Sequence, residues 1–563
     1  MQKKWKIKET DNKIVNDLAE SLGVSRSIAH LLVIRGVTTF DEAKQFFRPD
    51  FSQFHNPFLM KDMQKAVERI QSAIANNEKI LVYGDYDVDG TTSVAMLYTF
   101  LATLTENLDY YIPDRYTEGY GISLQGIDYA KEYNYTLIIA LDCGIRAVNQ
   151  INYANDKGVD FIICDHHNPA EEIPNAVAIL NPKQKDCNYP FKELSGCGVG
   201  LKLIQAFSEK NNIPFEEITP LFDLLVVSIA ADIVPMIDEN RAFSFFGLEQ
   251  INKNPRVGLK VLMDVANRKG KWTISDIVFG IAPRINAAGR IEQGKKAVAL
   301  LIETDSFKAA KLAQEIERLN KTRRGLDQDI TKQALSMIDD SKKSTVVYSQ
   351  DWHKGVVGIA ASRLIETYYK PTVVLAEKNG ELTGSARSVK GFDLYNALLQ
   401  CEKYLEKFGG HMYAAGLTLK KENLQDFIDA FERAVSDTIT EEQLTPEVTI
   451  DMELDLHDIG DKLFRLIQQF APFGPQNRTP IFITKAVKDS GYGRAVGADK
   501  THLRLNITNE NSRNSISSIG FGLAHHFKKI KDGQIFDICY SIDENDWNGR
   551  KNLQLKLRDI KSN

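Results

Sequence analysis

The sequence lacks the features of a membrane or secreted protein. Its most apolar run, residues 221–236, is interrupted by Asp223 and Asp232 and is too short to span a bilayer. Residues 1–13 contain no apolar core of the kind found in secretion signals. Repeats and low-complexity tracts are also missing. These absences predict a cytoplasmic protein without a membrane partner.

Cysteine is scarce, and neither sign of charge dominates. The six cysteines among 563 residues form no CxxC pair, so their spacing does not suggest a zinc site. Cys143 and Cys164 lie in apolar segments, as buried thiols in a reducing cytosol do. Lys and Arg number 70 against 75 Asp and Glu, so a site for a polyanion must be a local patch.

From about residue 51 short apolar runs alternate with helical segments. Residues 79–85, 136–144 and 160–167 are apolar runs with polar tips, and residues 91–104 have helical spacing. This alternation predicts an α/β fold with a parallel sheet covered by helices. Ligands of such sheets bind at the carboxyl ends of the strands, where the polar tips would gather.

The pattern divides the chain into five segments. A helical appendage is expected first, and its alternative interpretation, a helix-turn-helix, is disfavoured because no cluster of Arg and Lys lies on its second helix. A long polar helix connects two α/β domains, and the last segment has the short strands of a small OB-like β-barrel. The predicted segments are residues 1–50, 51–303, 304–340, 341–446 and 447–563.

Three carboxylates alternate in the segment GDYDVDG. Asp85, Asp87 and Asp89 would repel one another unless a cation neutralised them. The segment matches the start of an EF-hand loop, but Met96 occupies the position of the final Glu and a strand precedes the loop. The alternative to a metal site is a solvated acidic turn that caps the next helix.

Further acidic and histidine side chains follow the other apolar segments. They are Asp142, Asp165, His166, His167 and Asp232. Each by itself could be a cap, but burial of that much charge at one sheet edge is prohibitive without compensation. Two divalent cations would resolve it, and mixed carboxylate and imidazole ligands suit manganese, with magnesium as the other possibility. Such a pair can clamp the attacking and leaving oxygens of a phosphoryl displacement.

Several motifs in this sequence resemble known enzymes. GDYDVDG, LDCG, CDHH and AADIVP resemble the four motifs of the DHH phosphoesterase superfamily. Later segments resemble its RecJ family of bacterial single-stranded-DNA 5′→3′ exonucleases: PDRYTEGYG, SGCGVG, APRINAAGR, WHKGVVGIAASRL, GSARSVKGFDL and FGGHMYAAGL. The resemblance covers roughly residues 50–480. It implies a catalytic DHH domain, a substrate-binding DHH-associated domain and a nucleic-acid-binding OB-fold.

The resemblance also implies roles for individual residues. Metal ligation falls to Asp87, Asp89, Asp142, His166 and Asp232. Asp89, Asp142 and His167 take catalytic roles, and Asp85 and Asp165 orient the ligands. Because arginine forks and glycine backbones suit a terminal phosphate, the residues expected to bind the 5′ phosphate and the DNA are Arg115, Arg284, Arg290, Ser385, Arg387, Gly409, Gly410 and His411.

The function implied is release of 5′-mononucleotides from single-stranded DNA in repair and recombination. A helicase and a single-strand-binding protein are the implied partners, and the lack of a heptad run favours a monomer. One alternative is a hydrolase of short oligonucleotides or of phosphoadenosine phosphate, whose relatives lack the third domain. The other is a non-catalytic scaffold that binds single-stranded DNA. Such proteins have degraded metal motifs, whereas all five proposed ligands are present here.

Overall fold

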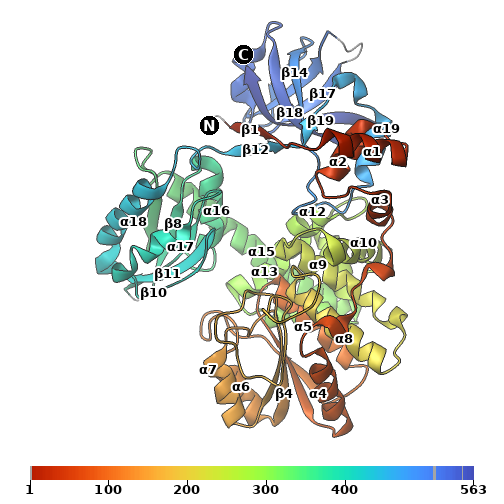
Figure 1. Ribbon diagram of the computed structural model, residues 1–563. Coiled ribbons are helices and arrows are strands. Elements are labelled where there is room, and N and C mark those ends of the chain that lie inside the picture. Colours follow the sequence, from red (N-terminus) through yellow and green to blue (C-terminus); the bar gives the residue numbers. More distant parts are fainter. Residues whose placement is uncertain (1–2, 379, 511–514, 548–549, 563) are drawn as a thin grey trace. The chain divides into compact units, whose positions relative to one another are not determined.

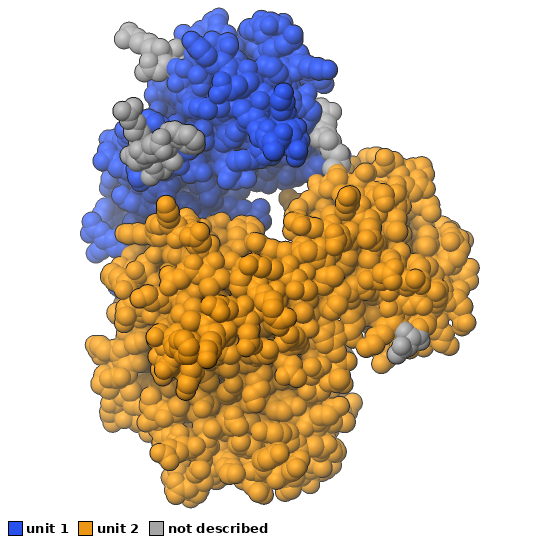
Figure 2. All heavy atoms as spheres, turned by 180° about the vertical axis from the view of Figure 1, so that it is seen from behind, with its two compact units in different colours: residues 1–50, 445–563 blue, residues 51–444 orange. Residues whose placement is uncertain are grey.

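The computed structural model describes residues 3–378, 380–510, 515–547 and 550–562. The chain forms two compact units, shown in different colours in Figure 2. Unit 1 combines residues 1–50 with residues 445–563, and unit 2 comprises residues 51–444. Unit 2 contains both α/β domains and the helix that joins them.

A five-stranded parallel sheet forms the first domain of unit 2. Its strands, in spatial order, are β3 (Leu108–Tyr111), β2 (Lys79–Gly84), β4 (Tyr135–Leu141), β5 (Asp160–Cys164) and β6 (Ala178–Leu180). The central strands are apolar and buried on both faces, as helices on both sides of a parallel sheet require. All four pairings are parallel, which confirms the predicted fold class.

Helices cover both faces of this sheet (Figure 1). One apolar cluster joins it to α6 (Leu124–Glu132) and α7 (Val148–Asp156). The other face packs against α4 (Met63–Ala75), α5 (Val88–Leu101) and α8 (Gly196–Lys210). Helix α5 is buried along almost its whole length, which accounts for its weak amphipathic pattern.

A helical subdomain completes the first domain and leads to the second. Its helices are α9 (Phe222–Asp232), α10 (Asp238–Lys253), α11 (Val257–Ala266), α12 (Ile274–Asp276), α13 (Ala282–Ile291) and α14 (Lys295–Ile302). The predicted connecting helix is α15 (Ser306–Leu335), and Asp305 caps its N-terminus. Its buried residues contact α13 at one end and α16 at the other.

The second domain of unit 2 is built on a mixed sheet. Its strands, in spatial order, are β10 (Lys407–His411), β11 (Ala414–Lys420), β9 (Glu381–Arg387), β8 (Thr372–Lys378) and β7 (Thr345–Ser349). Only β7 and β8 pair in parallel. The helices are α16 (Val357–Tyr368), α17 (Leu394–Leu399) and α18 (Leu424–Thr438).

Unit 1 contains a closed β-barrel. Its principal strands are β14 (Phe482–Asp489), β16 (His502–Thr508), β17 (Ile516–Gly520), β18 (Phe536–Trp547) and β19 (Arg550–Ser562). They pair in the order β14-β16-β17-β19-β18, and β18 returns to β14. The short strands are β12 (Glu447–Ile450), β13 (Met452–Glu453) and β15 (Arg494–Val496), with helices α19 (Asp461–Gln468) and α20 (Phe527–Ile530). The closed order agrees with the predicted OB-like barrel.

The N-terminal segment contains the helices expected of a helical appendage and, in addition, a strand that was not expected. It begins with strand β1 (Lys4–Ile7), which pairs in parallel with β12. Its helices α1 (Asn12–Leu22), α2 (Arg26–Val33) and α3 (Phe40–Phe47) share one hydrophobic core with the barrel. The segment therefore folds with residues more than four hundred positions away, a pairing that a local sequence pattern does not reveal.

In the part of the chain that the structure describes, no helix combines the length and the apolar composition that a membrane crossing requires.

Candidate metal centre

Carboxylates and imidazoles gather where β2, β4 and β5 end. Asp85, Asp87 and Asp89 follow β2, Asp142 follows β4, and Asp165, His166 and His167 follow β5. Asp232 joins them from the last position of α9. The carboxyl ends of parallel strands meet at one edge, so the topology brings these segments together.

Asp89 is held by the N-terminus of another helix. Its carboxylate accepts hydrogen bonds from the backbone amides of Gly196 and Cys197 on α8, at 2.7 and 2.9 Å. The hydroxyl of Ser228 on α9 donates to it at 2.7 Å. Helix N-termini attract anions, so these contacts fix a buried carboxylate in one orientation. A side chain at Gly196 would lie 2.6 Å from Cβ of Asp142, which explains the glycine there.

Three carboxylates converge on one nitrogen of His166. Its Nε2 atom lies 3.3 Å from Asp142 Oδ1, 3.6 Å from Asp232 Oδ2 and 3.8 Å from Asp89 Oδ2. Burial lowers the pKa of His166 despite the opposing charge of Asp89. A neutral imidazole that faces several carboxylates is the donor set of a divalent metal site.

The carboxylates of this cluster repel one another. Burial, followed by the charges of Asp89 and Asp87, raises the pKa of Asp142 well above its usual range. The same causes raise the pKa of Asp232 to about 8. Asp142 Oδ1 and Asp85 Oδ1 are buried and make no hydrogen bond within the described residues. Orphaned carboxylate oxygens of this kind fit a cation, because a cation compensates the charge that burial penalises.

Asp165 orients His167. One of its oxygens accepts hydrogen bonds from the backbone amides of His166 and His167 and from Nδ1 of His167, the last at 2.7 Å. Although burial opposes it, this bonding lowers the pKa of Asp165 to about 2. The pKa of His167 is raised overall. Burial of the imidazole acts to lower it, but the hydrogen bond and the charge of Asp165 outweigh the effect of burial. The structure thus places Asp165 against His167, and its orienting role stays a prediction.

Asp87 and Asp85 lie beside the cluster. Asp87 caps α5 and accepts a hydrogen bond from the Gly90 amide at 3.0 Å. Burial, followed by the charge of Asp89, raises the pKa of Asp87. Burial, followed by the charge of Asp87, raises the pKa of Asp85 well above its ordinary value. Two sets of possible ligands here have atoms within 4.8 Å of one another, Asp142 with His166 and His167, and Asp89 with His166 and Asp232, and Asp87 belongs to neither.

Cationic side chains line a wall between the two domains of unit 2. Arg290 donates to the backbone oxygen of Gly355 at 3.3 Å, and its own backbone oxygen accepts from the hydroxyl of Tyr116. Burial and the charge of Arg115 lower the pKa of Arg290 to about 10, and the charge of Arg387 adds to this. Cations that repel one another in this way would be stabilised by a bound anion.

Ser385 and Arg387 extend this wall on strand β9. Arg387 Nη1 donates to Ser385 Oγ at 2.7 Å. A side chain at Gly358, near the start of α16, would lie 3.1 Å from both Ser385 Oγ and Arg387 Nη2. The backbone of the first turn of α16 therefore lies close to the two side chains. We name Arg115, Arg290, Ser385 and Arg387 the phosphate wall, after the role proposed for them below.

Arg284 and the glycine pair have other surroundings. The buried Arg284 lies in an ion pair with Glu317 of α15, with Nε 2.8 Å from Oε2, and donates to the backbone oxygen of Gly280. This geometry gives Arg284 a structural position and does not support a phosphate contact. Gly409, Gly410 and His411 form the end of β10, an exposed edge strand, and the turn follows at residues 412–413.

Sequence reasoning missed two elements of the site. The motif SGCGVG was noticed, but its amides as partners of Asp89 were not predicted. The Gly-rich start of a helix beside an acidic motif could have indicated it. The second element is Tyr120, whose hydroxyl lies 3.2 Å from Nε2 of His167 while 59% of the residue is exposed. A lone tyrosine in a loop gives no such signal.

Protein-family models match three parts of the chain. The DHH family, N-terminal domain, matches residues 79–229. The DHHA1 domain matches residues 341–437, and the RecJ OB domain matches residues 450–559. Each match falls inside one of the segments predicted above.

Curated relatives and a solved structure match along most of the chain. The single-stranded-DNA-specific exonuclease RecJ of Bacillus subtilis is 39% identical over 99% of this chain and 70% of its own. That of Escherichia coli is 31% identical over 89% of this chain and 90% of its own. The crystal structure of RecJ in complex with Mn²⁺ from Thermus thermophilus aligns with a TM-score of 0.85 at 25% identity, over all of this chain and 80% of the other.

Proposed function

Because the chain belongs to the RecJ family of single-stranded-DNA-specific exonucleases, we propose that it hydrolyses single-stranded DNA from the 5′ end and releases 5′-mononucleotides. The observation that carries the proposal is the convergence of Asp89, Asp142 and Asp232 on Nε2 of His166. It belongs to a chain whose two α/β domains and barrel all match the family. The proposed setting is DNA repair and recombination.

The proposed ligands are Asp87, Asp89, Asp142, His166 and Asp232. The orphaned oxygen of Asp142 and the raised pKa values of Asp142 and Asp232 support this set. Two divalent cations, manganese by preference and magnesium as the alternative, would activate a water molecule and neutralise charge on the phosphate. Related structures hold Mn²⁺ or Mg²⁺.

The remaining groups position the substrate. Asp165 holds His167 so that its Nε2 atom, which lies near the Tyr120 hydroxyl, can contact the scissile phosphate. Because the pKa of His167 is raised, the imidazole gains a proton more readily and attracts that anion. Asp85 borders Asp87 and would orient the ligand set.

In this proposal the phosphate wall binds the 5′ end of the strand, and this sets the 5′→3′ direction of digestion. A terminal phosphate has more charge than an internal one, so a cluster of arginines discriminates in favour of an end. The mutual repulsion of Arg115, Arg290 and Arg387 supports an anion site there. Gly409, Gly410 and His411 on the exposed edge strand β10 would contact the strand further along.

The barrel of unit 1 offers aromatic and basic groups for single-stranded DNA. Phe521 is 57% exposed, and the ammonium of Lys556 lies 5.7 Å from the centre of its ring. His502 contacts the same ring edge-on at 5.1 Å. Exposed rings beside cations bind single strands through stacking and backbone contacts without reading sequence.

The proposal includes a cellular setting. A single-strand-specific enzyme requires unwound DNA, so we propose a helicase and a single-strand-binding protein as partners of a cytoplasmic monomer. The reducing surroundings of the cytosol agree with six buried free cysteines.

The test compares the wild type with Asp89→Asn in the presence of Mn²⁺. The substrate is single-stranded DNA with a labelled 5′ phosphate, and a blunt duplex serves as the control substrate. The expected result is early release of labelled mononucleotide from the single strand alone, and its loss in Asp89→Asn. Asp186→Asn is the matched control, because Asp186 forms an exposed salt bridge in the same domain.

Other outcomes would support different functions. Cleavage of dinucleotides while long strands stay intact would identify a hydrolase of short oligonucleotides. Binding without cleavage of any substrate would identify a scaffold and would contradict the proposed catalytic centre.

A further inference from the structure

One loop contacts both the phosphate wall and the metal centre. Residues 113–121, which we call the strap, connect β3 to α6. The guanidinium of Arg115 lies over the ring of Tyr86 at 5.0 Å, and the Tyr116 hydroxyl donates to the backbone of Arg290. At the other end of the strap, the Tyr120 hydroxyl lies 3.2 Å from His167 Nε2. The position of the strap therefore sets the position of Arg115.

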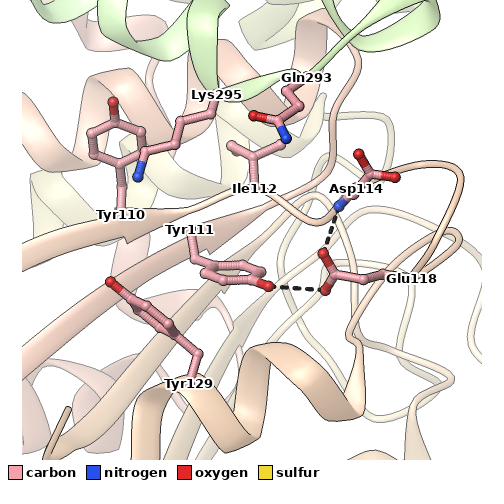
Figure 3. Close-up of a pocket in the computed structure, with 8 residues that line it drawn as sticks. All are labelled: Tyr110, Tyr111, Ile112, Asp114, Glu118, Tyr129, Gln293 and Lys295. Atoms are coloured by element: carbon pink, nitrogen blue, oxygen red, sulfur yellow. Dashed lines mark hydrogen bonds between the residues drawn. The ribbon is translucent and has the colours of Figure 1, made fainter. Parts of the chain in front are cut away.

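The carboxylate of Glu118 braces the strap from within, beside that of Asp114, which accepts hydrogen bonds from the backbone amides of Tyr116 and Thr117. Glu118 Oε1 accepts a hydrogen bond from the backbone amide of Asp114 at 2.7 Å. Its Oε2 atom accepts from the hydroxyls of Tyr111 at 3.0 Å and Ser123 at 2.5 Å. Figure 3 shows Glu118 pointing toward the Asp114 backbone and the Tyr111 ring. The brace thus ties the residue before Arg115 to strand β3 and to the start of α6.

One side of the strap borders a cavity. A cavity of about 170 Å³ lies beneath it, bordered by Tyr111, Asp114 and Glu118 and by Gln293 and Lys295 from the opposite side (Figure 3). A cavity provides no dispersion contacts, so hydrogen bonds must hold the chain there. The brace of Glu118 therefore helps to hold the Arg115 end of the strap, together with the contacts of Arg115 with Tyr86 and of Tyr116 with Arg290.

The Tyr120 end has an anchor of its own. The buried hydroxyl of Tyr83 donates to the backbone oxygen of Gly121 at 2.9 Å. Gly119 and Gly121 have φ values of 92° and 81°. Such residues let the backbone change direction freely, so a displacement at Glu118 need not reach Tyr120. We expect loss of the brace to act mainly on the Arg115 end, because the hydrogen bond from Tyr83 to Gly121 does not involve Glu118.

We propose that Glu118 is the positioning residue of the 5′-end reader. It fixes the strap so that Arg115 meets the terminal phosphate together with Arg290, Ser385 and Arg387. The inference rests on the proposed function, since it gives that function a residue that sets end recognition without touching the DNA. Glu118→Ala leaves the Asp114 amide and two hydroxyls without their acceptor, and a displacement of a catalytic-site group by about 1 Å can cost up to about 100-fold in rate.

The experiment separates end recognition from catalysis. The wild type and Glu118→Ala are each assayed in Mn²⁺ on 5′-phosphorylated and on 5′-hydroxyl single strands. Each is also assayed on bis(p-nitrophenyl) phosphate, a small diester without a 5′ end. We expect Glu118→Ala to raise KM for the phosphorylated strand about tenfold or more, with the preference for 5′ phosphate lost. Its kcat on the small diester should stay within about twofold, because the contacts of Asp89 and His167 are intact.

Conservative variants provide rescue. In Glu118→Gln, Oε1 still accepts from the Asp114 amide, and the hydroxyls can rotate to accept from the new amide group. This variant should retain most of the preference for 5′ phosphate. Tyr111→Phe removes one of the three hydrogen bonds, so it should weaken the preference in the same direction by a smaller factor. It keeps the test decisive if Glu118→Ala does not fold.

Glu432→Ala is the matched control. Glu432 braces its own loop in the second domain, where it accepts from the backbone amides of Lys343 and Ser344 at 3.0 and 2.9 Å and from the hydroxyl of Ser436 at 2.8 Å. Its loss should leave the end preference unchanged. The inference is overturned if Glu118→Ala keeps the wild-type preference, or if the small-diester activity falls in parallel. A wild type that degrades no single strand contradicts the proposed function instead.

Discussion

Asp232→Asn should stabilise the metal-free protein although it should abolish the metal-dependent activity. Burial and the charges of Asp89 and Asp87 raise the pKa of Asp232 from an ordinary 3.8 to about 8. The folded state then binds the proton more tightly than the unfolded state does. The associated stability is fully present below pH 3.8 and is lost progressively as the pH rises to 8. An amide does not titrate, so the variant escapes this loss.

The size of the effect follows from the shift and from the exposure of the side chain. A full shift from 3.8 to 8 would correspond to about 5–6 kcal/mol above pH 8. Because 30% of the Asp232 side chain is exposed, solvent screening reduces this, and we expect about 2 kcal/mol. At pH 5.5 less than half of the shift has taken effect, so the gain there should be less than about 1 kcal/mol.

The assay is thermal unfolding of chelator-treated wild type and Asp232→Asn at pH 5.5 and pH 8.5. The variant should melt higher at pH 8.5 and only slightly higher at pH 5.5, and saturating Mn²⁺ should reverse the order. Asp223→Asn is the control on the same helix, because Asp223 is paired with Arg256 at 3.0 Å and its loss should destabilise at both pH values. An equal gain at both pH values, or a loss at pH 8.5, would refute the reasoning.

Three further predictions concern other parts of the structure. Lys202→Met should destabilise unit 2 by about 3–5 kcal/mol, because it leaves the buried carboxylate of Glu239 without the ammonium group that lies 2.9 Å from it. Urea unfolding measures this loss, and the double variant Lys202→Met/Glu239→Gln should recover part of it. Asp89→Asn should weaken Mn²⁺ binding by at least about 100-fold, measured by titration calorimetry, and unchanged affinity would remove Asp89 from the ligand set. Arg284→Gln should lower stability through the loss of the ion pair with Glu317 but keep the preference for 5′ phosphate. Arg387→Gln should lose that preference. Degradation rates on 5′-phosphorylated and 5′-hydroxyl single strands distinguish the two arginines.

The sequence predicts the first domain well because its signals are local. The apolar runs at residues 79–85 and 136–144 correspond to strands β2 and β4, and the polar tips lie at the strand ends as expected. The predicted long helix is α15. Burial on both faces leaves a plain apolar pattern in a parallel strand, and this pattern can be identified without knowledge of its neighbours.

Contacts between distant segments escape sequence reasoning. Strand β1 is four residues long and only its pairing with β12 gives it a structure. The same motif that contains Arg290 also contains Arg284, yet only the structure shows that Arg284 lies against Glu317 of α15. The amides of Gly196 and Cys197 reach Asp89 because α8 packs across the sheet edge. In each case the decisive partner is set by tertiary packing.

The pairing of β1 with β12 also orders events during synthesis. Residues 4–50 leave the ribosome first, but the barrel that completes their core is made only after residues 51–444. At about 5–20 residues per second, synthesis of the roughly 510 residues that follow takes about 25–100 s, and we expect the apolar faces of the N-terminal helices to stay uncovered for that time. All residues of unit 2 are synthesised in that interval, so residues 4–50 can complete their core only after unit 2 has been made. A chaperone that holds the nascent chain would find its exposed surface on α1 and α2.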